Sequence, residues 1–278
     1  FVAPGFSGNI VRSTDNGLSW DNATSPTANT LWGVTYGNDT FVAFGSSGNI
    51  VRSTDNGSSW DNATSPTGKN IFGVTIGNDI FLGVGQSGNI VRSTDNGSSW
   101  DNATSPTANH LSGVAFGNDI FVAVGNSGNI VRSTDNGSSF DNVTSPTTGR
   151  MAGVTFGSNT FVGVGYLGNI VRSTDNGSSW DNATSPTANT LSGVAFGNDI
   201  FVAVGNSGNI VRSTDNGSSF DNVTSPTTGR MAGVTFGSNT FVGVGYLGNI
   251  VRSTDNGSSW DNATSPTALR LNGVTFKE

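Results

Sequence analysis

Three features of the sequence predict an all-β fold, a seven-bladed β-propeller of four-stranded antiparallel blades. The string Gly-Asn-Ile-Val-Arg-Ser-Thr-Asp-Asn-Gly recurs seven times at intervals of 40 residues, without an insertion. Each repeat holds four short apolar runs separated by Gly, Asn and Asp, and the two chain ends carry complementary parts of one repeat. We therefore expect a single domain, 1–278, of seven 40-residue repeats.

The second repeat contains the four expected strands in order. Residues 31–36 (LWGVTY) form the first and residues 41–44 (FVAF) the second. Residues 49–53 (NIVRS) form the third, and residues 58–64, which carry Trp60, form the fourth. Asn, Asp and Gly clusters between alternating apolar runs indicate hairpins, and no segment shows a long helical period. Four strands in one repeat are typical of a propeller blade.

The chain ends predict how the ring closes. Residues 1–5 align with the second strand of a repeat, at 41–45, and residues 271–276 align with the first strand, at 31–36. The C-terminal strand can therefore pair with the N-terminal blade and leave no inner edge open, a velcro closure. An open solenoid would need capping repeats with a polar outer face, and the sequence has none.

The repeats are nearly identical, which indicates recent amplification or deliberate design. Residues 111–188 reappear unchanged as residues 191–268. Because any blade can pair with any neighbour, swapped assemblies should compete with the closed monomer that we expect.

Composition excludes several classes of function. A net charge of -7 and a pI near 4.5 argue against a nucleic-acid partner. The chain has no Cys, so disulfides and cysteine-based metal or redox sites are excluded. No apolar run is long enough to span a membrane, and we expect no membrane partner and no cofactor. The chain opens at Phe1 without an initiator Met or a signal peptide, which indicates a processed or an engineered chain, with any targeting segment outside the given sequence.

Every repeat also carries the pattern Ser-x-Asp-x-Gly-x-x-Trp, called here the aspartate turn, which runs from Ser13 to Trp20 in the first copy; two copies end in Phe instead of Trp. The aspartate can accept hydrogen bonds from turn N–H groups, and the glycine permits a positive φ. Equivalent carboxylates in every blade are poor candidates for chemistry, because an active site needs carboxylates in different environments. A structural role is therefore expected for Asp15, Asp55, Asp95, Asp135, Asp175, Asp215 and Asp255.

Seven aspartate turns in register resemble the Asp-box (BNR-type) β-propeller repeat proteins. That group includes sialidases, sortilin-like receptors, some xyloglucanases and a photosystem assembly factor, and the resemblance covers the whole chain. It implies that the turn joins the third and fourth strands, and it suggests an extracellular or periplasmic location. WD repeats share the period but need a Gly-His partner, which is absent, so the Trp20-Asp21 pair is a coincidence. A calcium site is disfavoured because the turn lacks alternating acidic ligands.

A sialidase- or glycosidase-like enzyme is the alternative class of function, and the sequence disfavours it. Such a site needs distinct carboxyls that face one substrate, whereas the aspartates here occur in equivalent sets. The one histidine, His110, stands where other copies have Thr, and we expect it to face solvent. Arg12 and its equivalents are expected to serve their own blades. We therefore expect no catalytic residue and no metal site.

The copies differ mainly in two windows, and these predict where a ligand would bind. The first window is residues 29–32 and their equivalents, and the second is residue 6 and its equivalents between the second and third strands. In a propeller both connections lie on one face, and binding residues usually lie on such loops. The candidate ligand-binding residues in this variable rim are Trp32, Lys69, Phe72, His110, Arg150, Tyr166, Arg230, Tyr246 and Arg270.

The sequence also predicts that one face of the propeller is basic and the opposite face acidic. The first window contains four cationic residues, beginning with Lys69, and no acid, whereas the aspartate turns and Asp39 belong to the opposite face. Aromatic rings with Asn and Arg suit a carbohydrate or a small anion. The expected function is a non-catalytic binding or scaffold propeller. A designed or evolutionary-model propeller without a natural ligand is the alternative.

Overall fold

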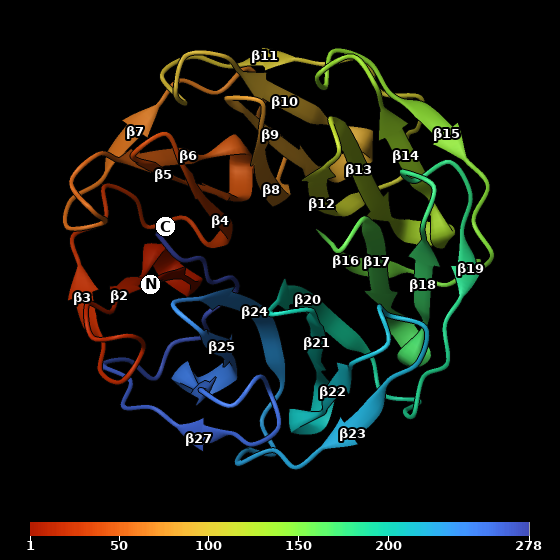
Figure 1. Cartoon of the computed structure of the whole chain (residues 1–278). Coiled ribbons are helices and arrows are strands. Elements are labelled where there is room, and N and C mark those ends of the chain that lie inside the picture. The colour runs from red at the N-terminus through yellow and green to blue at the C-terminus, as the bar shows by residue number, and fades with distance from the viewer. Residues whose placement is uncertain (278) are drawn as a thin grey trace.

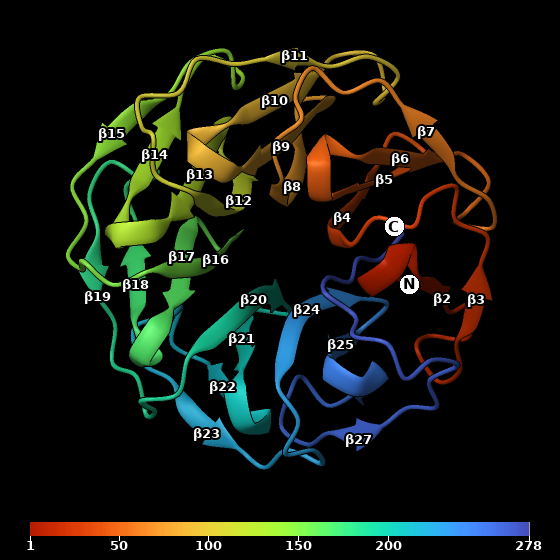
Figure 2. The ribbon, with the colours of Figure 1, turned by 180° about the vertical axis from the view of Figure 1, so that it is seen from behind.

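Seven antiparallel sheets stand around a common axis, as the sequence predicts (Figure 1). The structure, a computed structural model, describes residues 1–277, and these contain no α-helix. Six sheets have four strands in chain order, and the seventh has three, β1, β2 and β3. The blades are numbered 1 to 7 in chain order, beginning with the sheet of β1. The view from behind shows the same ring (Figure 2).

Each blade is an antiparallel meander whose strands follow one another in chain order, with the first strand nearest the axis and the last at the outer rim. The innermost strands are β4 (Leu31–Gly37), β8 (Ile71–Gly77), β12 (Leu111–Gly117), β16 (Met151–Gly157), β20 (Leu191–Gly197) and β24 (Met231–Gly237). The second strands are β1 (Val2–Pro4), β5 (Thr40–Gly45), β9 (Ile80–Gly85), β13 (Ile120–Gly125), β17 (Thr160–Gly165), β21 (Ile200–Gly205) and β25 (Thr240–Gly245). The third strands are β2 (Ile10–Arg12), β6 (Ile50–Ser53), β10 (Ile90–Ser93), β14 (Ile130–Ser133), β18 (Ile170–Ser173), β22 (Ile210–Ser213) and β26 (Ile250–Ser253). The outer strands are β3 (Asp21–Ala23), β7 (Asp61–Ala63), β11 (Asp101–Asn102), β15 (Asp141–Val143), β19 (Asp181–Asn182), β23 (Asp221–Val223) and β27 (Asp261–Asn262).

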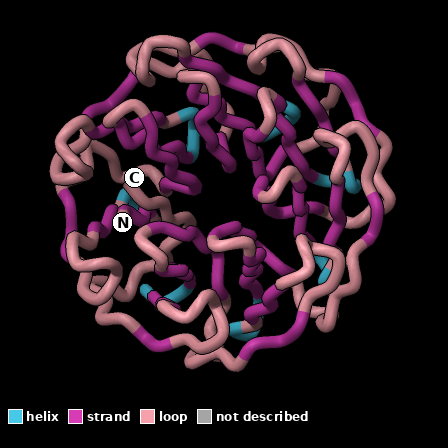
Figure 3. Tube along the Cα trace, in the orientation of Figure 1, coloured by secondary structure: helices cyan, strands magenta, loops and turns pink. Residues whose placement is uncertain are grey.

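Two kinds of connection lie at opposite ends of each blade. Innermost and second strands are joined by tight hairpins in which both central residues have positive φ, as at Asn38 (φ 49°) and Asp39 (φ 56°). Second and third strands are joined by short 3-10 turns, marked in cyan in Figure 3: η1 (Phe6–Gly8), η2 (Ser46–Gly48), η3 (Gln86–Gly88), η4 (Asn126–Gly128), η5 (Tyr166–Gly168), η6 (Asn206–Gly208) and η7 (Tyr246–Gly248).

The C-terminal segment completes blade 1. The Val2 N–H donates to the Thr275 carbonyl and the Thr275 N–H donates back, each over 3.0 Å. The Asn272 N–H donates to the Pro4 carbonyl over 2.9 Å. The two termini accordingly lie side by side in Figures 1 and 2. The predicted pairing of the C-terminal strand with the N-terminal blade agrees with these backbone bonds.

The hydrophobic core is divided into clusters that lie between neighbouring blades. In one of them Val2 and Ile10 of blade 1 pack with Phe41 and Trp60 of blade 2. Equivalent clusters fill the other interfaces. Each large apolar side chain removed from water contributes about 1.5–3 kcal/mol, so packing between blades is a major source of stability.

Candidate functional site

The innermost strands surround an axial channel with three successive sections. Along β4, Trp32 lines the section at the variable rim, Gly33 and Val34 line the waist, and Tyr36 lines the opposite mouth. The waist, about 150 Å³, is lined by the equivalent Gly-Val pairs of all seven blades. The cavity at the variable rim has a volume of about 240 Å³, and the opposite mouth has about 500 Å³.

The two variable windows meet at one end of this channel. In blade 2 the Ser46 N–H donates to the Thr30 carbonyl, and in blade 7 the Tyr246 N–H donates to the Arg230 carbonyl, each over 2.9 Å. Because the same bond joins the two windows in each blade, side chains from both windows surround the channel mouth. The variable rim is therefore one continuous surface, as the sequence predicts.

Six of the nine candidate residues line the rim cavity, which has neither a carboxylate nor a histidine in its wall. The cavity volume is small compared with sites for drug-sized ligands, which suits a ligand the size of a single ring. The six are Trp32, Phe72, Arg150, Tyr166, Arg230 and Arg270.

The other three candidates lie around the cavity. Tyr246 contacts two arginines of its wall. Lys69 is exposed on the rim. His110 is half-buried, and its Nδ1 accepts a hydrogen bond from the Ser87 N–H of blade 3 over 2.8 Å. One nitrogen of His110 is therefore engaged in holding blades 3 and 4 together, so this side chain is more than a solvent-facing polar group.

Two arginine–tyrosine pairs have the same geometry in two blades. Arg150 donates to the Tyr166 hydroxyl over 3.0 Å, and its guanidinium carbon lies 5.2 Å from the ring centroid. Arg230 donates to the Tyr246 hydroxyl over 3.1 Å, with its guanidinium carbon 5.1 Å from that ring. Each pair presents a cation and a ring to the channel mouth.

Arg270 adds a third cation that bridges three blades. Its guanidinium carbon lies 4.3 Å from the ring centroid of Tyr246, 5.6 Å from that of Trp32 and 5.7 Å from that of Phe6. Burial is the main cause that lowers the pKa of Arg270; the neighbouring Tyr246 opposes this shift, and the positive charge of Arg230 adds a smaller lowering. The side chain is held by aromatic faces, without an acidic partner in the cavity wall.

An arc of aromatic rings covers the other half of the mouth. The ring centroids of Phe6 and Trp32, of Trp32 and Phe72, and of Phe72 and His110 are each 6.2 Å apart. The first two pairs are edge-to-face contacts, the arrangement that ring quadrupoles favour. Trp32 also donates from Nε1 to the Ser46 hydroxyl over 3.1 Å, which fixes its orientation.

The cavity wall contains buried polar atoms that have no hydrogen-bond partner among the described residues. They are Nε of Arg230 and of Arg270, Oδ1 of Asn272, and the hydroxyls of Ser112 and Ser192. Buried polar groups are normally paired, so these five atoms leave hydrogen-bonding capacity unused in the residues of the cavity wall. Asn272 donates from Nδ2 to the Leu31 carbonyl over 2.7 Å, which leaves its oxygen free.

Sequence reasoning did not single out Asn272, Ser112 and Ser192. All three occupy the last position of the first window, the position of Trp32 and Phe72. That shared position was the available signal, but small polar residues in a loop are common and do not stand out.

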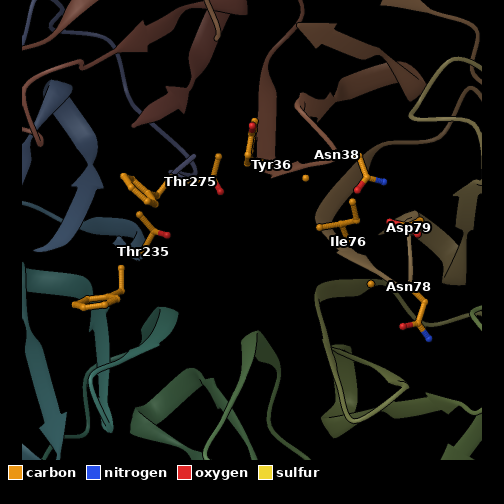
Figure 4. A pocket seen from close by; sticks show the side chains of 11 residues that line it. Tyr36, Asn38, Ile76, Asn78, Asp79, Thr235 and Thr275 are labelled. Carbon is orange, nitrogen blue, oxygen red and sulfur yellow. The ribbon is translucent and has the colours of Figure 1, made fainter. Parts of the chain in front are cut away.

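The opposite mouth is lined by Tyr36, Asn78 and Asp79 (Figure 4), and a second aspartate and a lysine lie beside it. The hydroxyl of Tyr36 donates to Oδ1 of Asp39 over 3.0 Å, and Asp79 also lines this mouth. Nζ of Lys277 lies 4.0 Å from Asp39 and 5.6 Å from the centre of the Tyr36 ring. The predicted division of charge did not include this lysine, which the closing segment brings to the acidic face.

The aspartate turns are closed structural units. In blade 3 the Asp95 carboxylate accepts from the Ser99 N–H over 2.9 Å, from the Ser99 hydroxyl over 2.6 Å and from the Ser93 hydroxyl over 2.8 Å. The Ser93 hydroxyl in turn accepts from the Gly97 N–H over 2.9 Å. The carboxylate is thus occupied within its own turn, which supports the expected structural role.

These bonds favour the ionised aspartate. The hydrogen bonds from the Ser99 hydroxyl and N–H lower the pKa of Asp95 to about 2, from an ordinary value of 3.8. At Asp255 burial is the largest single influence and raises the pKa, but the combined serine bonds outweigh it, and the pKa is again about 2. The pKa of every other aspartate in this motif is lowered too.

This pattern predicts loss of stability in acid. Between about pH 4 and about pH 2 the unfolded chain binds protons that the folded aspartates do not, so the free energy of unfolding falls as the pH is lowered through that range. At neutral pH, Asp95→Asn should cost about 1 kcal/mol, or about 2–4 °C in melting temperature. That difference should disappear as the pH approaches about 2. Thermal circular dichroism from about pH 7 to about pH 2 measures it.

Asp101→Asn is the matched control, because Asp101 is an exposed residue of the neighbouring outer strand β11. Its variant should follow the parent protein at every pH. If Asp95→Asn lowered the melting temperature by the same amount at every pH, the proposed link between stability and protonation of Asp95 would be wrong.

Five of the seven repeated arginines donate a hydrogen bond to the next blade, which corrects the expectation that each serves its own blade. Nε of Arg132 donates to the Asn176 carbonyl in the aspartate turn of the next blade, over 2.7 Å. The same bond joins Arg172 to Asn216 over 2.9 Å. Along the sequence these partners are 44 residues apart, so only the ring brings them together.

The part of the chain that the structure describes contains neither a helix suited to crossing a membrane nor a cluster of metal ligands. Within residues 1–277 we find no helix with the length and apolar character needed to cross a membrane. In the same residues no three His, Cys, Asp or Glu side chains are grouped as metal ligands.

Comparisons with known proteins support the fold. No family model and no curated protein matches the chain. A structure of YCF48 bound to a D1 peptide has a TM-score of 0.71 at 19% identity, covering 91% of this chain and 86% of that one. The WD40 repeats of RRP9 give 0.72 at 10% identity, covering 99% and 89%. The computationally designed protein Ika8 gives 0.63 at 10% identity, covering 96% and 80%. Likeness at these identities shows the fold alone: the chain is a β-propeller of seven near-identical blades.

Proposed function

We propose that this chain is a non-catalytic binding propeller of the Asp-box type, which holds a small carbohydrate or anionic ligand at the variable rim. One observation carries the proposal. Six residues chosen from the sequence as ligand-binding candidates converge on one cavity of about 240 Å³. That cavity also holds five buried polar atoms without partners among the described residues.

The chemistry of the cavity supports a ring-shaped polar ligand. Trp32 and Phe72 offer apolar ring surface, while Arg150, Arg230 and Arg270 offer fixed donors. The hydroxyl of Tyr166 can both donate and accept, and such mixed donors and acceptors suit a hydroxylated molecule. The Asp-box assignment is supported by the seven closed aspartate turns.

The absence of catalysis is part of the proposal. The cavity wall has no carboxylate and no histidine, so it lacks the imidazole and carboxyl groups that most often act as general acid or base. A panel of chromogenic glycosides should give no turnover. If a glycoside is hydrolysed and the Arg230→Gln substitution abolishes this activity, the glycosidase-like enzyme is favoured instead.

Binding at the rim can be tested with a defined set of sugars. We expect saturation-transfer NMR to detect at least one of the neutral sugars glucose, galactose and N-acetylglucosamine or the acidic glucuronate and glucose 6-phosphate. Titration calorimetry on Trp32→Ala and Phe72→Ala should then show binding weakened by about tenfold or more, because stacking surface is lost.

Tyr36→Ala is the control, since Tyr36 lies at the opposite mouth of the same strand β4. It should bind as the parent does, and melting curves must show that all variants fold. If none of the sugars binds the parent protein, the alternative of a propeller without a natural ligand is favoured. The near-identical repeats and the likeness to a designed protein already motivate that alternative.

A further inference from the structure

The duplicated block of the sequence contains an internal comparison. Residues 111–188 and 191–268 are identical, so Arg150 with Tyr166 and Arg230 with Tyr246 are two copies of one pair. Their hydrogen bonds and ring distances agree closely. The next window along the chain distinguishes the copies: it holds Thr190 after the first pair and Arg270 after the second.

Arg270 changes the surroundings of the second pair. Its guanidinium carbon lies 4.3 Å from the centre of the Tyr246 ring, while the Tyr246 hydroxyl accepts a hydrogen bond from Arg230. Two cations therefore contact one tyrosine, and their Nε atoms are buried without a partner among the described residues. No carboxylate lines the cavity to balance them.

Arg230 and Arg270 both contact Tyr246, so their like charges repel each other, and burial strengthens the repulsion because water screens them less. An anion that contacts both guanidiniums would relieve it. A guanidinium presents a planar fork of N–H donors that matches the oxygens of a carboxylate or a phosphate. The Tyr246 hydroxyl, which accepts from Arg230, keeps its own hydrogen available for a further oxygen.

We propose that Arg230, Arg270 and Tyr246 form an oxyanion subsite that binds one carboxylate or phosphate group at the channel mouth. This inference rests on the proposed function, since it assigns the charged end of the ligand to one side of the cavity. The aromatic arc of Trp32 and Phe72 then lies beside the ring of the same ligand. The pair of Arg150 and Tyr166 lacks the second cation and does not form such a subsite.

Titration calorimetry with inorganic phosphate and, separately, with acetate at low ionic strength tests the subsite. The parent protein should bind at least one of these anions, and the two titrations distinguish phosphate from carboxylate chemistry. Arg270→Gln and Arg230→Gln should each weaken binding about tenfold or more, the scale for a hydrogen bond to a charged group. The charge-matched control Lys277→Gln removes a cation at the opposite mouth, beside Asp39, and should bind the anion as the parent does.

A gain-of-function variant keeps the test decisive if a loss variant fails to fold. Thr190→Arg supplies the missing cation beside Tyr166, and Thr190 already lines the cavity. It should raise the stoichiometry from about one anion per chain to about two. Equal losses in Lys277→Gln and Arg270→Gln, or no anion binding by the parent protein, would overturn the subsite.

The two proposals fail in different ways. If neutral sugars bind at the rim but neither anion does, the oxyanion subsite is wrong and the binding function stands. If neither sugars nor anions bind, both proposals are wrong.

Discussion

Removing residues 271–278 is expected to open the ring and lower stability more than any single substitution. The deletion removes the backbone bonds between Val2 and Thr275 and takes Leu271, which is fully buried, out of the cluster between blades 7 and 1. The loss of Leu271 alone is worth about 2–5 kcal/mol. With Val274 also gone from that cluster, we expect a total of about 5 kcal/mol or more, and a melting temperature lower by about 10 °C or more.

The deletion should also change the state of association. Without its inner partner, β1 presents an unpaired strand edge beside exposed apolar side chains, including Phe1 and Trp20. We therefore expect dimers or larger assemblies by size-exclusion chromatography with light scattering. A synthetic peptide of residues 270–278 added in trans should restore part of the lost stability. A monomeric deletion variant with an unchanged melting temperature would contradict ring closure as a source of stability.

Gly128→Ala is expected to have the second-largest effect, because two constraints meet at this residue. Gly128 ends the 3-10 turn η4 with φ +70°, a conformation that costs an L-residue about 1–2 kcal/mol. An added Cβ would also overlap the Thr147 carbonyl oxygen, a backbone atom of the segment leading to the next blade. Since that overlap requires a backbone shift, the total should reach about 3 kcal/mol.

Gly68→Ala is the matched control for this substitution. Gly68 has no heavy atom within 4 Å of an added Cβ. The change should be neutral or slightly stabilising, because alanine reduces the entropy of the unfolded chain. Urea denaturation of both variants measures the difference, and equal stabilities would contradict the role assigned to the glycine that ends each 3-10 turn.

Much of the architecture could be predicted because the repeat is regular. The period of 40 residues, the alternation around Phe41 and the Asn38-Asp39 hairpin together determine the number of blades, the strand order and the face to which each loop belongs. The offset of residues 1–5 and 271–276 within the repeat determines the closure. Local propensity and pattern suffice for these features, because each blade repeats the same short-range contacts.

The candidate site could be located from the sequence but not described. Arg230 and Arg270 occupy equivalent positions in the first window, so the sequence assigns both to one rim. The sequence gives no sign that Arg270 contacts the rings of Phe6, Trp32 and Tyr246. His110 is a second example. Its sequence context predicts a side chain that faces solvent, but in the structure it accepts a hydrogen bond from the Ser87 N–H of blade 3. Such contacts depend on side-chain rotamers at the meeting of adjacent blades.

The sequence by itself thus determined the repeat unit, the closed ring and the two faces, because these arise from periodicity and from strand patterning within 40 residues. Only the tertiary structure decided which side chains meet at the mouth and which polar atoms remain unpaired there. Those facts depend on side-chain rotamers and on the curvature of the ring, which brings together the windows of successive blades, such as those of Arg230 and Arg270, 40 positions apart in the sequence. A pattern within one repeat cannot predict such contacts between side chains of different blades.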